Sequence, residues 1–298
     1  MTFVPQIPKK VKFIFDFSFP LVRRLCRKTL SEQFVGGRKG YDKEFLFMLL
    51  LMKKVTHWDY RTIASMGNIC HTTLVRANNF FLKKRVYEKV FSHLVKQALK
   101  RGLIKGKYVA MDSSFVHTFS KHGELGSEGW NDFKKAYGFK LHCLIDAETK
   151  FPIVLCITNG LASDNTLAIP LLKKAKPYLL KKGYILADKG YDDQDIVSWI
   201  VKELHSKAGI PMRKKSILAK GKKYRYGNLL NWMLKAQGRT LKKTIYNKRT
   251  AIERTFSMLK RVYHLGKEET RGILAFARNA YLSLICYMLS LFDIAISI

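Results

Sequence analysis

The chain has 298 residues, enough for one large domain or two ordinary ones, and hydrophobic residues make up 47% of it, which excludes global disorder. Its 55 Lys and Arg residues against 22 Asp and Glu give a formal net charge of +33. So much like charge repels itself in a compact protein unless a polyanion neutralises it, and nucleic acid is favoured over an anionic membrane surface or a ribosome-like structural role.

Neither a zinc site nor a disulfide framework is predicted, because the five cysteines form no C-x-x-C pair and the eight histidines show no ligand spacing. This pattern fits a cytoplasmic protein, associated with the nucleoid through its charge. The amino terminus lacks the charged-then-apolar order of a signal peptide. The apolar tail 281–298 contains Asp293 and continues a helix that carries Arg278. A buried packing helix is therefore expected there, and no membrane partner.

Residues 1–105 are predicted to form an all-helical domain. Asp42-Lys43-Glu44 opens the apolar run 45–51, and a further helix is expected over 86–101. Between them, a short helix at 59–66, a break at 67–70 and a second helix at 71–81 resemble a helix-turn-helix unit.

The second helix of this pair carries a polar face that is suited to reading DNA. Its candidate DNA-binding residues are Thr72, Thr73 and Arg76. Many helix pairs share a glycine turn, so plain scaffold packing remains the alternative interpretation of this pair.

From residue 106 the hydrophobic period changes from helix to strand, and a second domain is predicted over 106–298. The expected elements, in chain order, are strands at 108–116, 137–145 and 152–158, a helix at 166–182, a strand at 184–187, a helix at 193–207, a strand at 209–212, a long helix at 244–264 and a closing helix from 272. Three strands at hairpin spacing followed by alternating helices and strands is the order of a ribonuclease H-like α/β domain with a mixed sheet. A basic, turn-rich insertion occupies 214–240.

Three acids stand where a carboxylate needs an explanation. Asp112 interrupts the apolar strand that begins at Tyr108, and Asp188 ends the apolar run 184–187. Glu253 lies within a strongly basic stretch, since residues 202–271 contain 20 Lys and Arg against 4 Asp and Glu. A buried or cation-ringed carboxylate requires compensation, which a divalent metal provides well. Asp192, which follows Asp188 closely, is interpreted as a turn or helix-cap residue.

The long helix aligns four functional side chains. At about 100° per residue, Tyr246, Arg249, Glu253 and Lys260 fall within a stripe of about 60°. Taken alone, Arg249 and Glu253 could be an ordinary i,i+4 ion pair. The acids in the strands make a functional stripe the better interpretation.

The spacing of these four residues matches the Y-R-E-K signature of DDE transposases encoded by bacterial and archaeal insertion sequences. Residues 111–114 resemble the first-aspartate motif of that family, and residues 187–192 resemble the second. The similarity covers roughly residues 106–290, and three motifs in the right order make it specific.

The resemblance implies that Asp112, Asp188 and Glu253 hold two Mg²⁺ or Mn²⁺ ions for in-line attack on DNA phosphodiesters. It also implies that Tyr246, Arg249 and Lys260 grip phosphates near the cut. The expected partners are terminal inverted repeats, target DNA and a second copy of the chain in a synaptic complex. The alternatives are a related metal-dependent nuclease or resolvase without strand transfer, and a DNA-binding regulator without catalysis.

Overall fold

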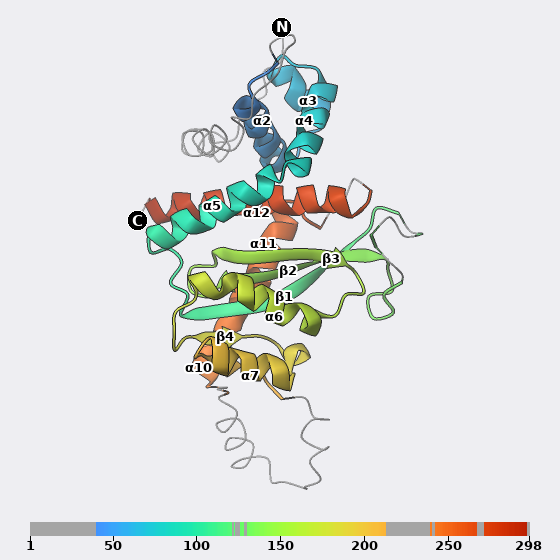
Figure 1. Cartoon of the computed structure of the whole chain (residues 1–298). Helices are drawn as coiled ribbons and strands as arrows, with labels where there is room; N and C mark the ends of the chain where they lie inside the picture. The colour runs from blue at the N-terminus through green and yellow to red at the C-terminus, as the bar shows by residue number, and fades with distance from the viewer. Residues whose placement is uncertain are drawn as a thin grey trace. The chain divides into compact units, whose positions relative to one another are not determined.

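The computed structural model describes residues 40–120, 122, 126–127, 130–212, 239, 242–266 and 271–296. Of the predicted basic insertion at 214–240, all but Arg239 lies outside the described residues. The chain divides into two compact units. One comprises Met1–Gln97 and Met258–Ile298, and its described residues are mainly helical; the other comprises Ala98–Ser257 and contains the sheet (Figure 1).

A five-stranded sheet with the strand order β3-β2-β1-β4-β5 forms the centre of the unit Ala98–Ser257. Its strands are β1 (Tyr108–His117), β2 (Gly138–Asp146), β3 (Pro152–Asn159), β4 (Tyr184–Leu186) and β5 (Lys207–Gly209). The first three strands pair antiparallel, and β4 and β5 join parallel on the other side of β1. β2 is buried along almost its whole length, as expected for a central strand that is covered on both faces. The predicted mixed α/β sheet is confirmed.

Helices lie on both sides of this sheet. They are α6 (Asp164–Ala175), α7 (Gln194–Glu203), α10 (Lys243–Tyr246) and α11 (Thr250–Arg261), together with the 3₁₀ turns η1 (Lys176–Tyr178), η2 (Lys189–Tyr191) and η3 (Asn247–Arg249). α6 packs against β2 and β3, whereas η3 lies against β1. In Figure 1, α6 is drawn in front of the sheet and the start of α11 behind it.

Three predicted boundaries differ from the structure for local reasons. The helix expected over 166–182 ends at Ala175 and is followed by the 3₁₀ turn η1, because Pro177 has no N–H to donate to the carbonyl four residues before it. The last strand stops at Gly209, two residues before Pro211, which has no N–H to give to a sheet. The expected helix over 244–264 is interrupted by η3, where the Thr250 hydroxyl donates to the carbonyl of Asn247 at 2.9 Å. Such a local bond competes with the regular helical pattern.

The helical unit is built from α2 (Lys43–Thr56), α3 (Tyr60–Met66), α4 (His71–Lys83), α5 (Val86–Lys100) and α12 (Ile273–Ile296). Asp42 and Asp59 cap α2 and α3 by accepting from backbone N–H groups at 3.0 and 2.8 Å. In the core, Phe47 packs edge to face on Phe81 with ring centroids 5.6 Å apart, and Tyr87 contacts both rings.

The last helix belongs with the amino-terminal helices. α12 packs against α2 and α4, and its Tyr281 contacts Phe91 of α5 at a ring distance of 6.3 Å. The sequence-based division at residue 105 instead assigns this helix to the second predicted domain, 106–298. The difference arises because α12 is apolar on most of its surface, and hydrophobicity alone does not say which neighbour covers a helix.

α12 is also long and apolar enough, by length and composition, to raise the question of a membrane span. The stretch Ile273–Phe292 has a mean hydropathy of 1.4, and 61% of it is buried within the protein. This burial favours the expected packing helix.

A buried carboxylate secures the turn between β2 and β3. Asp146 is fully buried, and its Oδ2 accepts from the N–H groups of Lys105 and Gly106 at 2.8 and 2.9 Å. Its Oδ1 accepts from Glu148 and Thr149 at 2.9 and 3.1 Å. One side chain thus joins the entry into β1 to the turn that precedes β3.

We expect Asp146→Ala to lower the free energy of unfolding by about 3 kcal/mol, because several buried N–H groups lose their acceptor at once. Urea unfolding measures this loss, with Asp132→Ala, which removes an exposed carboxylate, as the control. Equal stability of the two variants would contradict this structural role of Asp146.

Candidate active site

The register of the sheet brings the first two predicted acids together. β1 and β4 are parallel neighbours, and Ala110 pairs with Leu186. Asp112 lies two residues beyond Ala110, and Asp188 lies two residues beyond Leu186. Because side chains alternate along a strand, this equal spacing directs both carboxylates to the same face of the sheet, side by side.

The negative charge of the Asp112 carboxylate is only partly compensated by the groups around it. Burial raises its pKa from 3.8 to about 6, and the neighbouring Asp188 and Asp164 add to the rise. The backbone N–H of Ser113, which donates to Oδ1 at 2.8 Å, and the Arg249 guanidinium act in the opposite direction. The net upward shift means that the charged form of this carboxyl group is disfavoured here, chiefly by burial, and a bound cation would compensate that charge.

Arg249 connects the third predicted acid to the first. Its Nη2 donates to Oε1 of Glu253 at 2.7 Å, and its Nη1 lies 3.9 Å from Oδ2 of Asp112. The guanidinium carbon also lies 5.8 Å from the centre of the Tyr246 ring. Despite the 3₁₀ turn, three residues of the predicted stripe therefore gather beside β1: Tyr246, Arg249 and Glu253.

A second polar cluster, not predicted from the sequence, is built on α6 and β2. Oδ1 of Asp164 lies 3.3 Å from Nζ of Lys140 and 3.5 Å from Nδ1 of His142. His142 is fully buried, and its Nε2 lies 2.9 Å from the hydroxyl of Thr158. Burial, assisted by Lys140, lowers the pKa of His142 to about 4, so its ring is neutral at pH 7. Lys140 is left as the cation that faces Asp164.

Comparison with known proteins identifies the family to which the chain belongs. The family model described as "Transposase DDE domain" matches residues 105–289, which includes all three acids and most of the sheet unit. No curated protein sequence matches the chain.

The chain belongs to the DDE-domain transposases.

Two solved transposase structures were found to be similar to the chain. The piggyBac transposase, in a synaptic complex with hairpin DNA, is 12% identical with a TM-score of 0.51, and the match covers 97% of this chain and 75% of that one. The Mos1 transposase, in a paired-end complex with the left transposon end, is 10% identical with a TM-score of 0.25, over 93% of this chain and 90% of that one. The first of these supports the ribonuclease H-like fold.

Two aspartates near the second motif of the transposase have structural roles. Asp192 lies 2.7 Å from Nη1 of Arg239, and both side chains are almost completely buried. Asp193 caps α7 by accepting from the N–H groups of Asp195 and Ile196. Asp188 therefore remains the candidate ligand in this segment.

The metal that DDE transposases use would find suitable ligands here. Asp112, Asp188 and Glu253 supply carboxylate oxygens, the ligands that Mg²⁺ and Mn²⁺ prefer. Within the described part of the chain, no three His, Cys, Asp or Glu side chains already stand in a metal-binding arrangement. The position of Arg249 between Asp112 and Glu253 is a physical reason for this, because its cation lies between two of the three carboxylates.

The backbone beside Asp188 is shaped to hold a carboxylate. The N–H of Gly190 donates to Oδ1 of Asp188 at 2.7 Å, and a Cβ at residue 190 would lie at 2.7 Å from the same oxygen. Glycine therefore permits a close approach that another residue would obstruct. The residues present fit a divalent cation beside Asp112 in the middle of β1 and Asp188 just beyond the end of β4.

The other residues predicted to contact DNA are on α4 and near the end of α11. Lys260 is half-buried in α11, two turns beyond Glu253. On α4, Thr72 and Arg76 are exposed and Thr73 is half-buried, and α3 packs against α4 across the predicted turn. The helix pair thus exists, and DNA contact through it stays a prediction.

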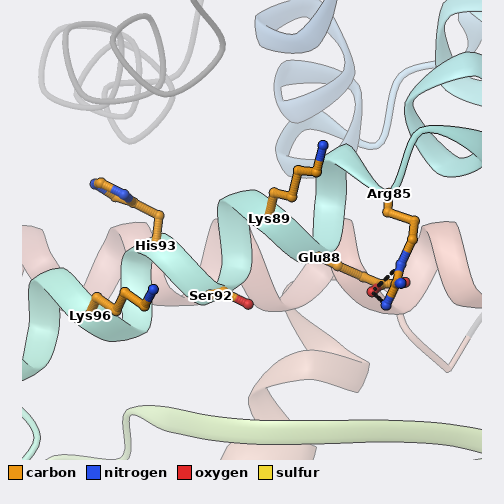
Figure 2. A pocket seen from close by; sticks show the side chains of 6 residues that line it. All are labelled: Arg85, Glu88, Lys89, Ser92, His93 and Lys96. Carbon is orange, nitrogen blue, oxygen red and sulfur yellow. Dashed lines mark hydrogen bonds and ion pairs between the residues drawn. The ribbon is translucent and has the colours of Figure 1, made fainter. Parts of the chain in front are cut away.

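The transposase also has an exposed basic face along α5. Figure 2 shows the side chains that line an open pocket there: Arg85, Glu88, Lys89, Ser92, His93 and Lys96. Arg85 is paired with Glu88 at 2.8 Å, while Lys89 and Lys96 are exposed on the same helix. Such cations suit contacts with phosphates.

Proposed function

We propose that this transposase binds the ends of an insertion sequence, cuts the DNA strands there with the aid of two divalent metal ions, and joins them to target DNA. The observation that carries the proposal is the pairing register that places Asp112 beside Asp188, with Glu253 connected to Asp112 through Arg249. The family match to residues 105–289 contains this whole arrangement.

The residues divide the chemistry between them. Asp112, Asp188 and Glu253 would hold Mg²⁺ or Mn²⁺. Bound metal at such a site lowers the pKa of an attacking hydroxyl and stabilises the leaving oxygen. Tyr246 and Arg249 already contact each other, with the guanidinium over the tyrosine ring, and Arg249 brings a planar cation beside the acids. An arginine in this position can bind a DNA phosphate through two parallel hydrogen bonds.

DNA is the partner that the charge of the chain favours. The net charge of +33 predicts binding that weakens steeply as salt is added, because bound cations displace condensed counterions. We assign end recognition to the exposed face of α4, with Thr72, Thr73 and Arg76, and additional phosphate contacts to α5.

We further propose that the protein acts as a homodimer, because two ends must be joined together. We also propose that it is located in the cytoplasm at the nucleoid.

A strand-transfer assay tests the function. Labelled DNA that carries the inverted repeats flanking the gene is incubated with the protein, Mg²⁺ and an unlabelled target plasmid. We expect nicked ends and, in addition, labelled ends joined to the target. Cut ends without joined products would assign the protein to the metal-dependent nucleases. Specific binding without any cutting would assign it to the non-catalytic regulators.

A further inference from the structure

The hydroxyl of Tyr191 is a buried polar group without an evident structural purpose. The side chain is 1% exposed, and its hydroxyl has no hydrogen-bond partner among the residues that the structure describes. A buried hydroxyl without a partner is destabilising, whereas phenylalanine would fill the same space at no such cost. The presence of tyrosine therefore indicates a partner that this arrangement does not yet supply.

The backbone places Tyr191 next to the second acid. Tyr191 ends η2, the turn that begins immediately after Asp188, and its N–H donates to the carbonyl of Asp188 at 3.2 Å. η2 packs against α6, which carries Asp164. Burial raises the pKa of Tyr191 well above 10, and the charges of Asp164, Asp112 and Asp188 raise it further. The phenol therefore keeps its proton at neutral pH and is close enough to three carboxylates for their charges to act on it.

Of these three carboxylates, Asp112 and Asp188 have fewer hydrogen-bond donors around them than Asp164. Asp164 already faces Lys140 and His142. In contrast, Asp112 and Asp188 each receive one backbone N–H on Oδ1, from Ser113 and Gly190 respectively. The nearest side-chain cation to Asp112, Arg249, lies 3.9 Å from Oδ2 and is shared with Glu253.

We propose that Tyr191 is a positioning residue, whose hydroxyl donates to a carboxylate oxygen of the Asp112–Asp188 pair and holds that carboxylate in the orientation that binds a divalent cation. The inference rests on the proposed function, since it assumes that this pair binds metal. Donors that orient metal-binding carboxylates commonly change metal affinity by 10–100-fold. No bond is made or broken at Tyr191, and the phenol keeps its proton throughout.

Tyr191→Phe tests the proposal, because it removes only the hydroxyl. Binding of Mn²⁺ alone to the full chain is measured by electron paramagnetic resonance, and the unfolding temperature is measured with the metal removed. We expect the dissociation constant for Mn²⁺ to rise about 10-fold. The unfolding temperature should stay the same or rise, because an unsatisfied buried group is removed.

Tyr263→Phe is the matched control. Tyr263 is also buried, but its hydroxyl lies 2.8 Å from that of Ser290, so its loss should lower the unfolding temperature and leave Mn²⁺ affinity unchanged. Unchanged Mn²⁺ affinity in Tyr191→Phe would overturn the proposal, as would a fall in affinity accompanied by a lower unfolding temperature. The proposed function is tested separately by Asp112→Asn, since Mn²⁺ binding that is indifferent to this change would overturn the metal site itself.

Discussion

Asp112→Asn is expected to lower the rate of metal-dependent strand cleavage by about 10³-fold or more. The same change should stabilise the metal-free protein at pH 7. The loss of cleavage follows from the loss of a negative ligand, since metal stabilisation of the transition state amounts to several kcal/mol. The gain in stability follows from the raised pKa of this carboxyl group, about 6 in the folded protein against an ordinary value of 3.8.

The sign of the stability change comes from proton binding. Between about pH 4 and pH 6 the folded protein holds the Asp112 proton while the unfolded chain has lost it, so the free energy of unfolding falls as the pH rises through this window. Above pH 6 the full cost of the buried charge is present, up to about 3 kcal/mol. Asparagine has no charge to bury, so Asp112→Asn recovers this energy at pH 7 and not at pH 4.

Urea unfolding in the presence of a chelator, at both pH values, measures the stability effect, and cutting of labelled DNA measures the catalytic one. Mg²⁺ should stabilise the wild-type protein and have little effect on the variant, because a ligand that binds only the folded state raises its stability. Asp132→Asn, at an exposed position, is the control and should change neither property. A variant that is less stable than wild type at pH 7, or that still cuts DNA, would refute the assignment of Asp112.

The parts of the candidate site that depend on local pattern can be predicted from the sequence. Asp112 stands out because it interrupts an apolar strand, and Asp188 because it ends one, so the two strands can be predicted before any contact is known. Glu253 stands out through its spacing from Tyr246 and Arg249. Each of these signals lies within a few residues of the side chain concerned.

The parts that were missed depend on contacts between distant segments. Asp164 begins α6, but only the packing of α6 on β2 brings it to Lys140 and His142. Tyr191 looks like an ordinary core aromatic, and a sequence does not reveal that a buried hydroxyl lacks a partner. The one available signal was its position, three residues after Asp188.

Arg249 illustrates a third case, in which the local pattern was right but incomplete. The i,i+4 pairing with Glu253 was considered from spacing alone, and the structure contains it. What spacing could not predict is the second contact, with Asp112, because that contact requires η3 to lie against β1. Arg249 can therefore form an ion pair with Glu253 and also serve as a functional residue beside Asp112.

Glu253→Gln is expected to lower cleavage by about 10³-fold while the fold and its stability stay nearly unchanged. The carboxylate is half-exposed, with 52% of the side chain accessible, so its charge contributes little to stability. Glutamine keeps the shape and an oxygen that can still accept from Arg249, so the loss of the i,i+4 pair should cost only a few tenths of a kcal/mol. What the variant lacks is the third negative ligand.

Glu203→Gln provides a closely matched control. Glu203 has 53% of its side chain accessible and is also paired with a cation, Lys176, at 3.4 Å, but it lies at the end of α7. The two variants should therefore unfold at the same urea concentration as wild type, within about 0.5 kcal/mol. Only Glu253→Gln should fail to cut labelled end DNA in Mg²⁺. Metal-dependent cutting near the wild-type rate would remove Glu253 from the set of ligands, whereas equal losses in both variants would point to a general effect of charge on DNA binding.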